Sequence, residues 1–249
     1  MSLLQVDNVS CHFGSLIAVN QVSLSVETGE LRAVIGPNGA GKTTFFNLIS
    51  GFLPPTHGRI LLDGTDITAL PAQRRVALGM ARTFQITEIF PELTVRENLQ
   101  IPVELAAGHR LSPYLSRRQA AALAAETEEL LVMSNLADKA DRLVGELSHG
   151  DQRATEIMMS LALKPRLLLL DEPTAGMGDQ ETYDISRLIR KLHKDRNLTI
   201  ILIEHDMRVV FNLADRIMVL AEGAPLAEGT PAEIAASEKV QTAYLGTAA

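Results

Sequence analysis

The sequence is poor in cysteine and in aromatic residues. Of its 249 residues, Cys11 is the one cysteine, tryptophan is absent and aromatic residues make up 4%. One cysteine cannot form a disulfide within the chain or supply the cysteine cluster of a zinc site, which fits a reducing compartment. The N-terminal stretch MSLLQVDNVSCHFG has no basic segment followed by an apolar run, so we predict no signal peptide.

Long apolar runs and an excess of basic charge are also missing. The leucine run at 167–170 is far shorter than the roughly 20 residues that a membrane-spanning helix needs. The net charge of -7 argues against nucleic-acid binding, which needs a broad basic face. With 46% hydrophobic and 21% charged residues, the composition is that of a globular protein. We expect a cytoplasmic protein with no nucleic-acid partner, which reaches a membrane only through another protein.

Hydrophobic patterning predicts an α/β protein. Residues 1–35 alternate in the manner of strands, and the nearly all-apolar stretch at 31–36 is typical of a strand buried on both faces. The stretch at 166–173 resumes that buried-strand pattern, and 199–206 predicts a further strand. Helices are predicted at 42–50, 71–79, 179–195 and 207–215, and a hairpin-like pair of strands at 216–229. Strands that alternate with helices favour a mostly parallel sheet.

The middle of the chain has a different composition. The stretch at 116–136 is rich in alanine and leucine, lacks β-branched runs and predicts a helix. No strand pattern is evident from there to about residue 162. We therefore interpret roughly 92–162 as a helical insertion in a single domain, whose core is formed by roughly 1–91 and 163–249.

A phosphate-binding motif follows the buried strand at 31–35. The sequence GPNGAGKT at 36–43 matches G-x-x-x-x-G-K-[ST] and leads directly into a helix, which is the context that the motif requires. Its backbone N–H groups, the helix N-terminus and the lysine are expected to bind phosphate oxygens, and the threonine hydroxyl to bind Mg²⁺. The expected nucleotide-binding residues are Gly36, Pro37, Asn38, Gly39, Ala40, Gly41, Lys42, Thr43 and Thr44. The alternative is a glycine-rich turn with an incidental lysine.

A pair of acidic residues ends the second buried strand. Asp171 is placed to hold magnesium, and Glu172 to polarise an attacking water as a general base. The alternative is an acidic pair that caps a helix before Pro173. Together with the phosphate motif, the pair indicates nucleotide hydrolysis.

The order of these motifs and three further ones resembles the nucleotide-binding domain of ATP-binding cassette (ABC) transporters. Between the phosphate motif and LLLLDEP lie Gln85 in RTFQ and the segment LSHGDQR at 147–153, and EHD follows at 204–206. The resemblance covers the chain from Phe13 to His205. It implies a P-loop NTPase core with a mostly parallel sheet, an N-terminal antiparallel β subdomain and an inserted α-helical subdomain, and it implies ATP and Mg²⁺ as ligands.

The resemblance also implies roles for single residues. Phe13 would stack on adenine, Gln85 would sense the γ-phosphate and magnesium, and His205 would contact the γ-phosphate. The expected catalytic residues are Lys42, Gln85, Glu172 and His205, and the expected metal-binding residues are Thr43, Gln85 and Asp171. Each added role has an alternative, because Phe13 could be a core aromatic, Gln85 a solvated strand end and His205 part of a helix cap.

The segment at 147–153 corresponds to the signature of the family. In that family two ATPase domains pack head to tail, so Ser148 and Gly150 would face the ATP of a partner chain; the alternative is an ordinary helix N-cap by Ser148. The chain departs from the usual L-S-G-G-Q at His149 and Asp151, and Gly178 replaces the usual aspartate that follows the acidic pair. We expect Asp151 to face a ribose or solvent, because a carboxylate near phosphate is unfavourable.

Subfamily features resemble the ATPase subunits of branched-chain amino acid importers. They lie in ARTFQITEIFPELTVRENL, LIEHDMRVV and VQTAYLG. The resemblance implies a second ATPase chain, alike or different, membrane permease subunits, a substrate-binding protein, and a peripheral position on the cytoplasmic face of the membrane. ATPases for urea, aromatic acids or lipopolysaccharide export, a soluble non-transport ATPase and a non-hydrolysing binding module remain alternatives. Phe90 is expected either to contact the permease or to fill the core.

Overall fold

The computed structural model describes residues 2–83, 89–108 and 116–245, and its residues divide into two compact units. The first unit comprises Met1–Arg82, Arg166–Glu172 and Arg190–Ala249, and the second comprises Thr83–Pro165 and Pro173–Ile189. The second unit therefore begins before the expected insertion at about residue 92 and also takes in the segment after Glu172. Each unit is described by itself.

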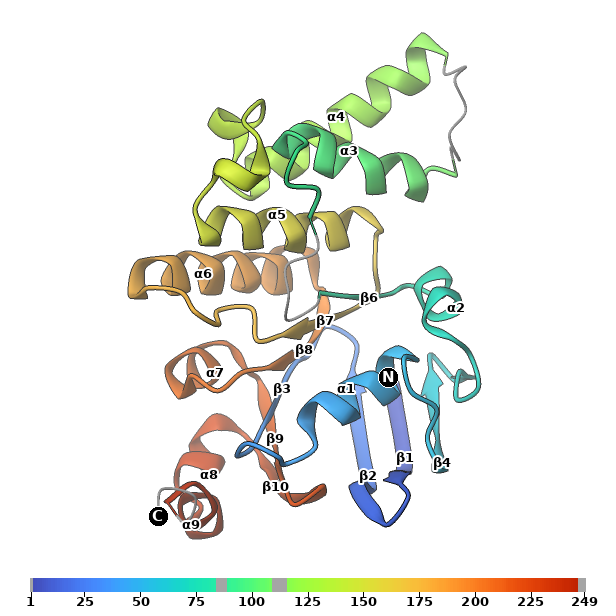
Figure 1. Cartoon of the computed structure of the whole chain (residues 1–249), viewed down its shortest axis with the longest axis vertical. Coiled ribbons are helices and arrows are strands. Elements are labelled where there is room, and N and C mark those ends of the chain that lie inside the picture. The colour runs from blue at the N-terminus through green and yellow to red at the C-terminus, as the bar shows by residue number, and fades with distance from the viewer. Residues whose placement is uncertain (1, 84–88, 109–115, 246–249) are drawn as a thin grey trace. The chain divides into compact units, whose positions relative to one another are not determined.

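A six-stranded sheet organises the first unit (Figure 1). Its strands, in spatial order, are β10 (Ala224–Gly229), β9 (Arg216–Ala221), β3 (Leu31–Ile35), β8 (Thr199–Ile203), β7 (Leu167–Asp171) and β6 (Met80–Arg82). Every residue of β3, β7 and β8 is buried, which explains why these strands are almost entirely apolar rather than alternating. Their polar members are Arg32, Asp171 and Thr199. All neighbours pair in parallel except β9 and β10. The predicted mostly parallel sheet and C-terminal hairpin are confirmed.

An antiparallel four-stranded sheet belongs to the same unit. Its order is β2 (Leu16–Glu27), β1 (Ser2–Phe13), β4 (His57–Leu62) and β5 (Thr65–Asp66). Buried residues such as Leu4 and Val22 share one hydrophobic core with Phe45 and Phe46 of α1 (Lys42–Ser50). The helix that follows the phosphate motif is thus fixed by its apolar face, while its N-terminus stays at the strand ends.

Shorter helices complete the first unit. They are α2 (Ala72–Ala77), α7 (Met207–Leu213), α8 (Pro231–Ala235) and α9 (Glu238–Leu245). Our sequence interpretation assigned no element to α8 or α9. A capping box between Thr230 and Glu233 starts α8, with proline at the first turn. The longer α6 (Asp179–Arg196) begins in the second unit and ends in the first.

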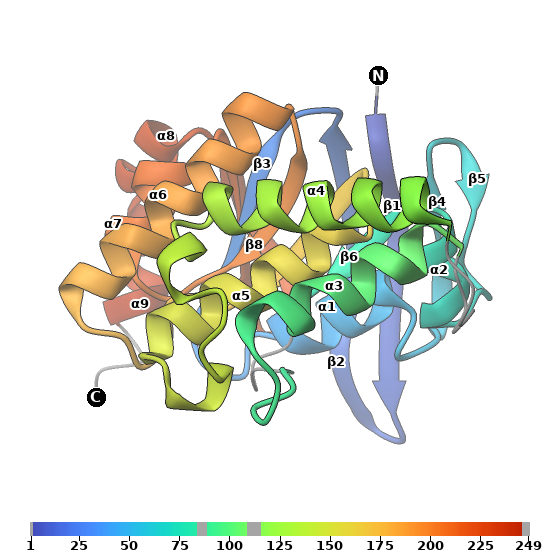
Figure 2. The same cartoon turned by 90° about the horizontal axis from the view of Figure 1, so that it is seen from above.

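The second unit is helical in its described part. It contains α3 (Val95–Ala106), α4 (Arg117–Met133), the 3₁₀ turns η1 (Ala137–Lys139) and η2 (Val144–Glu146), and α5 (His149–Ala162). Helix α3 packs against both α4 and α5 (Figure 2). Capping boxes at Thr94 and Ser116 start α3 and α4. Across residues 2–83, 89–108 and 116–245, no helix has the length and apolar character needed to cross a membrane.

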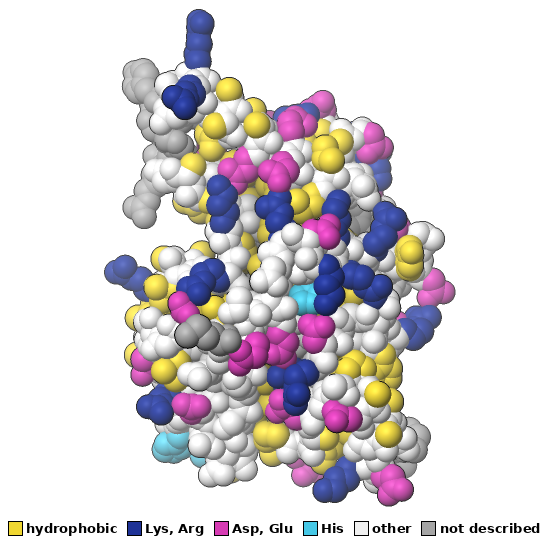
Figure 3. All heavy atoms as spheres, turned by 180° about the vertical axis from the view of Figure 1, so that it is seen from behind, with side chains coloured by type: hydrophobic (Ala, Val, Ile, Leu, Met, Phe, Trp, Pro, Cys, Tyr) yellow, Lys and Arg dark blue, Asp and Glu magenta, His cyan; other side chains and the backbone are white. Residues whose placement is uncertain are grey.

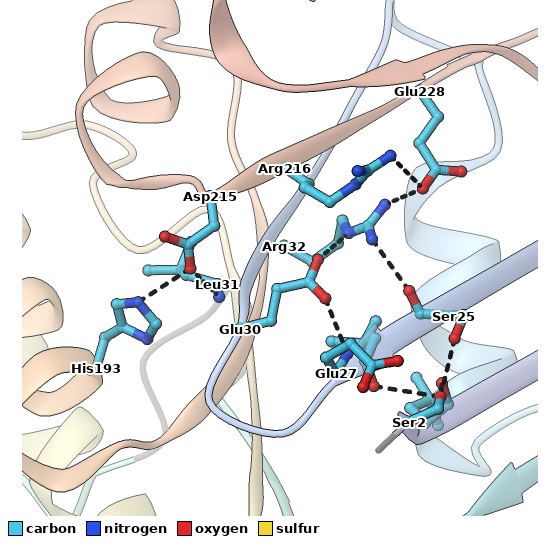
Figure 4. A network of polar contacts seen from close by, with 12 residues as sticks. Ser2, Ser25, Glu27, Glu30, Leu31, Arg32, His193, Asp215, Arg216 and Glu228 are labelled. Carbon is cyan, nitrogen blue, oxygen red and sulfur yellow. Dashed lines mark hydrogen bonds and ion pairs between the residues drawn. The ribbon is translucent and has the colours of Figure 1, made fainter.

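A buried arginine stabilises the strand that leads into the phosphate motif (Figure 4). Arg32 on β3 donates to Glu30 at 2.6 Å and to the Ser25 carbonyl at 3.0 Å, and also contacts Glu228 of β10. Nearby, Asp215 accepts the Leu31 N–H at 2.8 Å. Because a buried charge is tolerated only when it is paired and hydrogen-bonded, this network fixes β3 against its neighbours.

Candidate nucleotide site

The loop between β3 and α1 requires glycine at two close approaches. A Cβ at Gly36 would lie 2.1 Å from the Leu220 carbonyl oxygen, and a Cβ at Gly41 would lie 2.3 Å from that of Ala18. Gly41 is also the N-cap of α1, with φ of 90°, and forms no side-chain cap hydrogen bond. The first turn of α1 is therefore not capped by a side chain of the chain itself, an arrangement suited to an anion.

Lys42 lies over this loop. Its Nζ donates to the carbonyl oxygens of Gly36 at 2.7 Å and Pro37 at 3.0 Å. Burial lowers the pKa of Lys42, while the nearby carboxylates of Glu172 and Asp171 oppose that shift. The structure thus places Lys42 of the phosphate motif within electrostatic reach of Asp171 and Glu172 in the first unit.

Asp171 is buried and paired with an arginine that the sequence interpretation missed. Arg82 at the end of β6 donates to Asp171 Oδ2 at 2.8 Å, and both side chains are less than a tenth exposed. The guanidinium also donates to Asn47 Oδ1 and Ser50 Oγ of α1, each at 2.7 Å. It therefore connects the strand that carries Asp171 to the helix that follows the phosphate loop. Its sequence signal was slight, because Arg82 is simply the first residue of RTFQ.

Glu172 has an unusual backbone conformation. Its φ is 46°, in the left-handed region, and its N–H donates to the Ile203 carbonyl at 2.9 Å. Such a conformation in a non-glycine residue persists where neighbouring structure imposes it, commonly at functional sites. The carboxylate is 23% exposed, and its Oε2 lies 4.0 Å from His205 Nδ1. A partly exposed carboxylate beside a histidine can accept a proton from water.

Glu204 holds the turn that carries His205. Its side chain is fully buried, and its Oε2 accepts the N–H groups of His205 at 3.0 Å and Asp206 at 3.4 Å. Asp206 in turn caps α7 by accepting the Arg208 N–H. The alternative role considered for His205 was to cap α7 together with Asp206. Asp206 makes that cap, whereas the side chain of His205 is 63% exposed. The motif EHD at 204–206 did not by itself indicate this role of Glu204.

Phe13 lies at the end of β1 and is 49% exposed, so it does not fill the core. It pairs with Leu16 at the turn into β2, and Ala18 of the same strand is the close neighbour of Gly41. Leu16 and Ile17 are exposed as well. The hairpin thus presents apolar side chains at the strand that contacts the phosphate loop.

The signature residues lie in the second unit. Ser148 caps α5 by accepting the Asp151 N–H at 3.2 Å, and Gly150 is buried in the first turn. The expectation that Asp151 faces ribose or solvent is wrong, because its carboxylate binds Lys139 Nζ at 2.7 Å. The lysine neutralises a charge that would otherwise stand close to this helix N-terminus. Gln85 lies outside the residues that the structure describes.

The residues present suit a nucleotide with a hard cation. The glycine loop fits close approach of a phosphate, and Thr43 and Asp171 supply the oxygen donors that Mg²⁺ prefers. Magnesium in such sites is held by few protein oxygens together with substrate phosphates. Among the described residues, no three His, Cys, Asp or Glu side chains cluster as a metal site.

Comparison with known proteins assigns the family. The sequence profile described as ABC transporter matches residues 19–175, and that of the branched-chain amino acid ATP-binding cassette transporter matches residues 224–249. The chain is 43% identical to the high-affinity branched-chain amino acid transport ATP-binding protein BraF of Pseudomonas aeruginosa, over 99% of this chain and 98% of that protein. It therefore belongs to the ABC transporter family, as the motif order indicated.

Solved structures agree with this assignment. The ADP conformation of an ATP-binding cassette of an ABC transporter superposes with a TM-score of 0.85 at 29% identity, covering 99% of each chain. A dimeric cassette in a post-hydrolysis state bound to ADP and phosphate superposes with a TM-score of 0.76 at 25% identity, covering 92% of this chain and 98% of the other. The predicted P-loop NTPase fold is confirmed.

Replacing Arg82 is expected to destabilise the first unit strongly. Arg82→Ala leaves Asp171 buried without its guanidinium, and breaking a buried ion pair in this way costs about 3–5 kcal/mol. Urea unfolding followed by circular dichroism measures the effect. Arg59→Ala is the matched control, because Arg59 pairs with Asp7 on the surface and should contribute less than about 1 kcal/mol. Equal effects of the two substitutions would contradict the role given to Arg82.

Proposed function

We propose that this chain is the ATP-binding and ATP-hydrolysing subunit of an ABC importer, and that it powers uptake of branched-chain or related amino acids through a partner permease. The observation that supports it most is the site of the first unit, where Lys42 lies over the glycine loop and within electrostatic reach of Asp171 and Glu172. The cargo is inferred from the relative BraF and from the match at residues 224–249.

Different residues of the chain bind the phosphates, the adenine and the metal ion of the nucleotide. The N–H groups of the loop and of the first turn of α1 hold the phosphates, and Lys42 exchanges its carbonyl partners for phosphate oxygens. Phe13 stacks on adenine from the end of β1. Thr43, Asp171 and Gln85 would hold Mg²⁺, which supplies charge neutralisation on the phosphates.

Hydrolysis needs a base beside the terminal phosphate. Glu172 accepts a proton from the attacking water while the new P–O bond forms and the bond to the leaving ADP oxygen breaks. His205, held by the buried Glu204, donates a hydrogen bond to the γ-phosphate. The left-handed backbone of Glu172 fixes where its carboxylate enters the site.

The proposed assembly is inferred from membership of the ABC transporter family and from the signature segment at 147–153. Two ATPase chains, alike or different, pack head to tail, so that Ser148 and Gly150 of one face the nucleotide of the other. Permease subunits and a substrate-binding protein complete the importer, with this chain peripheral on the cytoplasmic face. Figure 3 shows side chains of both charge signs on the face that it draws.

Phe90 is our candidate permease contact. It is 49% exposed, which argues against the alternative that it fills the core. Its backbone is fixed by buried Asn98 of α3, which accepts the Phe90 N–H at 2.8 Å and donates to its carbonyl at 3.0 Å. An exposed aromatic side chain on a fixed backbone is typical of an interface anchor.

Purification of the intact complex tests the proposal. We expect wild-type chain to co-purify with permease subunits, and leucine with its binding protein to raise ATPase activity in proteoliposomes. Phe90→Asp should prevent co-purification and leave the isolated chain folded by circular dichroism. Phe211→Asp is the control, since Phe211 on α7 is also exposed, at 39%, and should assemble normally. Stimulation by urea or an aromatic acid, and not by leucine, would reassign the cargo.

A further inference from the structure

A carboxylate of the chain itself lies against the signature turn. Glu181, in the first turn of α6, accepts the Gly150 N–H at 3.0 Å through Oε1. The Ser148 hydroxyl and the Gly178 N–H lie close enough to this carboxylate to lower its pKa as well. All of these residues belong to the second unit, so the contact is internal to one compact part of the molecule.

The contact is tight and favours the charged form of Glu181. A Cβ on Gly150 would lie 3.1 Å from Glu181 Cγ and 3.2 Å from its Oε1, so only glycine allows this approach without adjustment. The Gly150 N–H lowers the pKa of Glu181 most, with further lowering by Gly178, Ser148 and the neighbouring His149. The carboxylate is therefore anionic, and the Gly150 N–H holds it by a charge-assisted hydrogen bond.

These donors are the ones that the proposed dimer needs. If Ser148 and Gly150 face a partner's nucleotide, the Ser148 hydroxyl and the Gly150 N–H must donate to its γ-phosphate. Each of these groups has a single hydrogen. A carboxylate and a phosphate cannot both accept that one hydrogen at full strength. Two anions close enough to compete for the same donor also repel each other.

We infer that Glu181 is a latch, meaning that it occupies the Gly150 N–H of the signature turn within one chain and must be displaced when the head-to-tail dimer closes on ATP. The inference rests on the proposed function, because it concerns the same signature residues. The γ-phosphate replaces the carboxylate as the acceptor, and Glu181 moves to solvent, which its partly exposed position allows. Asp151 does not compete, since Lys139 holds it.

One departure from the usual pattern agrees with the latch. Gly178, in place of the usual aspartate, brings no competing negative charge to the surroundings of the Glu181 carboxylate. Dimer closure in this chain is therefore opposed by an internal contact that only a stronger anion can replace.

The test uses the full-length chain with Glu172→Gln to prevent turnover, alone and together with its partner ATPase chain. Dimer formation in ATP is measured by sedimentation or light scattering over a protein dilution series. Adding Glu181→Gln removes the charge and weakens the latch, so the dimer dissociation constant should fall about tenfold, as loss of a competing charge-assisted hydrogen bond predicts. Glu181→Asp, which shortens the reach of the carboxylate, should act in the same direction.

The control is Asp184→Asn. Asp184 is an exposed acidic residue one turn further along α6, and it accepts a hydrogen bond from Gln180 at 3.0 Å. This substitution removes the same charge from the same helix and should leave the dissociation constant unchanged. Binding of a fluorescent ATP analogue to the monomer, and circular dichroism, should be the same for all variants, because the phosphate loop and the fold are not altered.

The outcomes separate the latch from the proposed function. An ATP-dependent dimer that Glu181→Gln leaves unchanged or weakens would overturn the latch and leave the head-to-tail assembly standing. A dimer that forms only after Glu181 is replaced would support both. Absence of any ATP-dependent dimer, with or without Glu181 and with the partner chain present, would overturn the proposed assembly itself.

Discussion

Lys42→Ala is expected to lower ATP turnover by roughly 10²–10³-fold and to weaken nucleotide binding. The lysine contacts phosphates whose charge grows at the transition state, and removing one such donor has an effect of about this size. In the structure its ammonium already lies at the loop, 2.7 Å from the Gly36 carbonyl, so nothing has to unfold for it to reach a phosphate.

The measurement is ATPase activity with the partner chain present, together with equilibrium binding of a nucleotide analogue. Lys164→Ala serves as the control. That lysine is 64% exposed at its side chain, pairs with Glu126 in the second unit and should leave both quantities unchanged. A Lys42→Ala protein with normal turnover would remove the loop at 36–43 from consideration as the nucleotide site.

The sequence predicted those features that arise from local pattern. The five buried residues of β3 and the motif that follows them define a strand, a loop and a helix by composition and spacing alone. The same holds for β7 and Asp171 at its end. The motif predicted that positions 36 and 41 need glycine. The structure explains this need, because a Cβ at Gly36 or Gly41 would collide with the carbonyl oxygen of Leu220 or Ala18, respectively.

Side-chain partners distant in sequence could not be predicted. Arg82 and Asp171 are 89 positions apart, and Glu181 and Gly150 are 31 apart. No periodicity or motif spacing relates such pairs, because they meet only after the sheet and helices have packed. The Lys139–Asp151 pair shows the same limit over 12 positions, and it reversed an expectation drawn from electrostatics near phosphate alone.

Glu172→Gln is expected to convert the chain into a stable dimer in ATP and to leave it monomeric in ADP. The substitution keeps the shape and hydrogen bonding of the side chain and removes the proton acceptor, so bound ATP persists. In the proposed assembly each ATP contacts both chains. A ligand that binds only the dimer shifts the equilibrium toward it, with itself or with its partner ATPase.

Ser148→Arg added to Glu172→Gln should abolish that dimer. Ser148 is exposed at the N-cap of α5, and an arginine there would place bulk and positive charge against Lys42 of the opposing phosphate loop. The loss of the cap itself weakens α5 by about 0.5–2 kcal/mol, which must be separated from the effect at the interface.

Ser116→Arg is the control that separates the loss of a helix cap from the effect at the interface. Ser116 caps α4 in the same unit with the same kind of hydrogen bond, so its replacement removes a cap without touching the signature turn. Size-exclusion chromatography with light scattering should show a dimer in ATP for Glu172→Gln with Ser116→Arg, and a monomer for Glu172→Gln with Ser148→Arg. A dimer that survives Ser148→Arg would mean that the segment at 147–153 does not face a partner's nucleotide, and Ser148 would then be an ordinary helix cap.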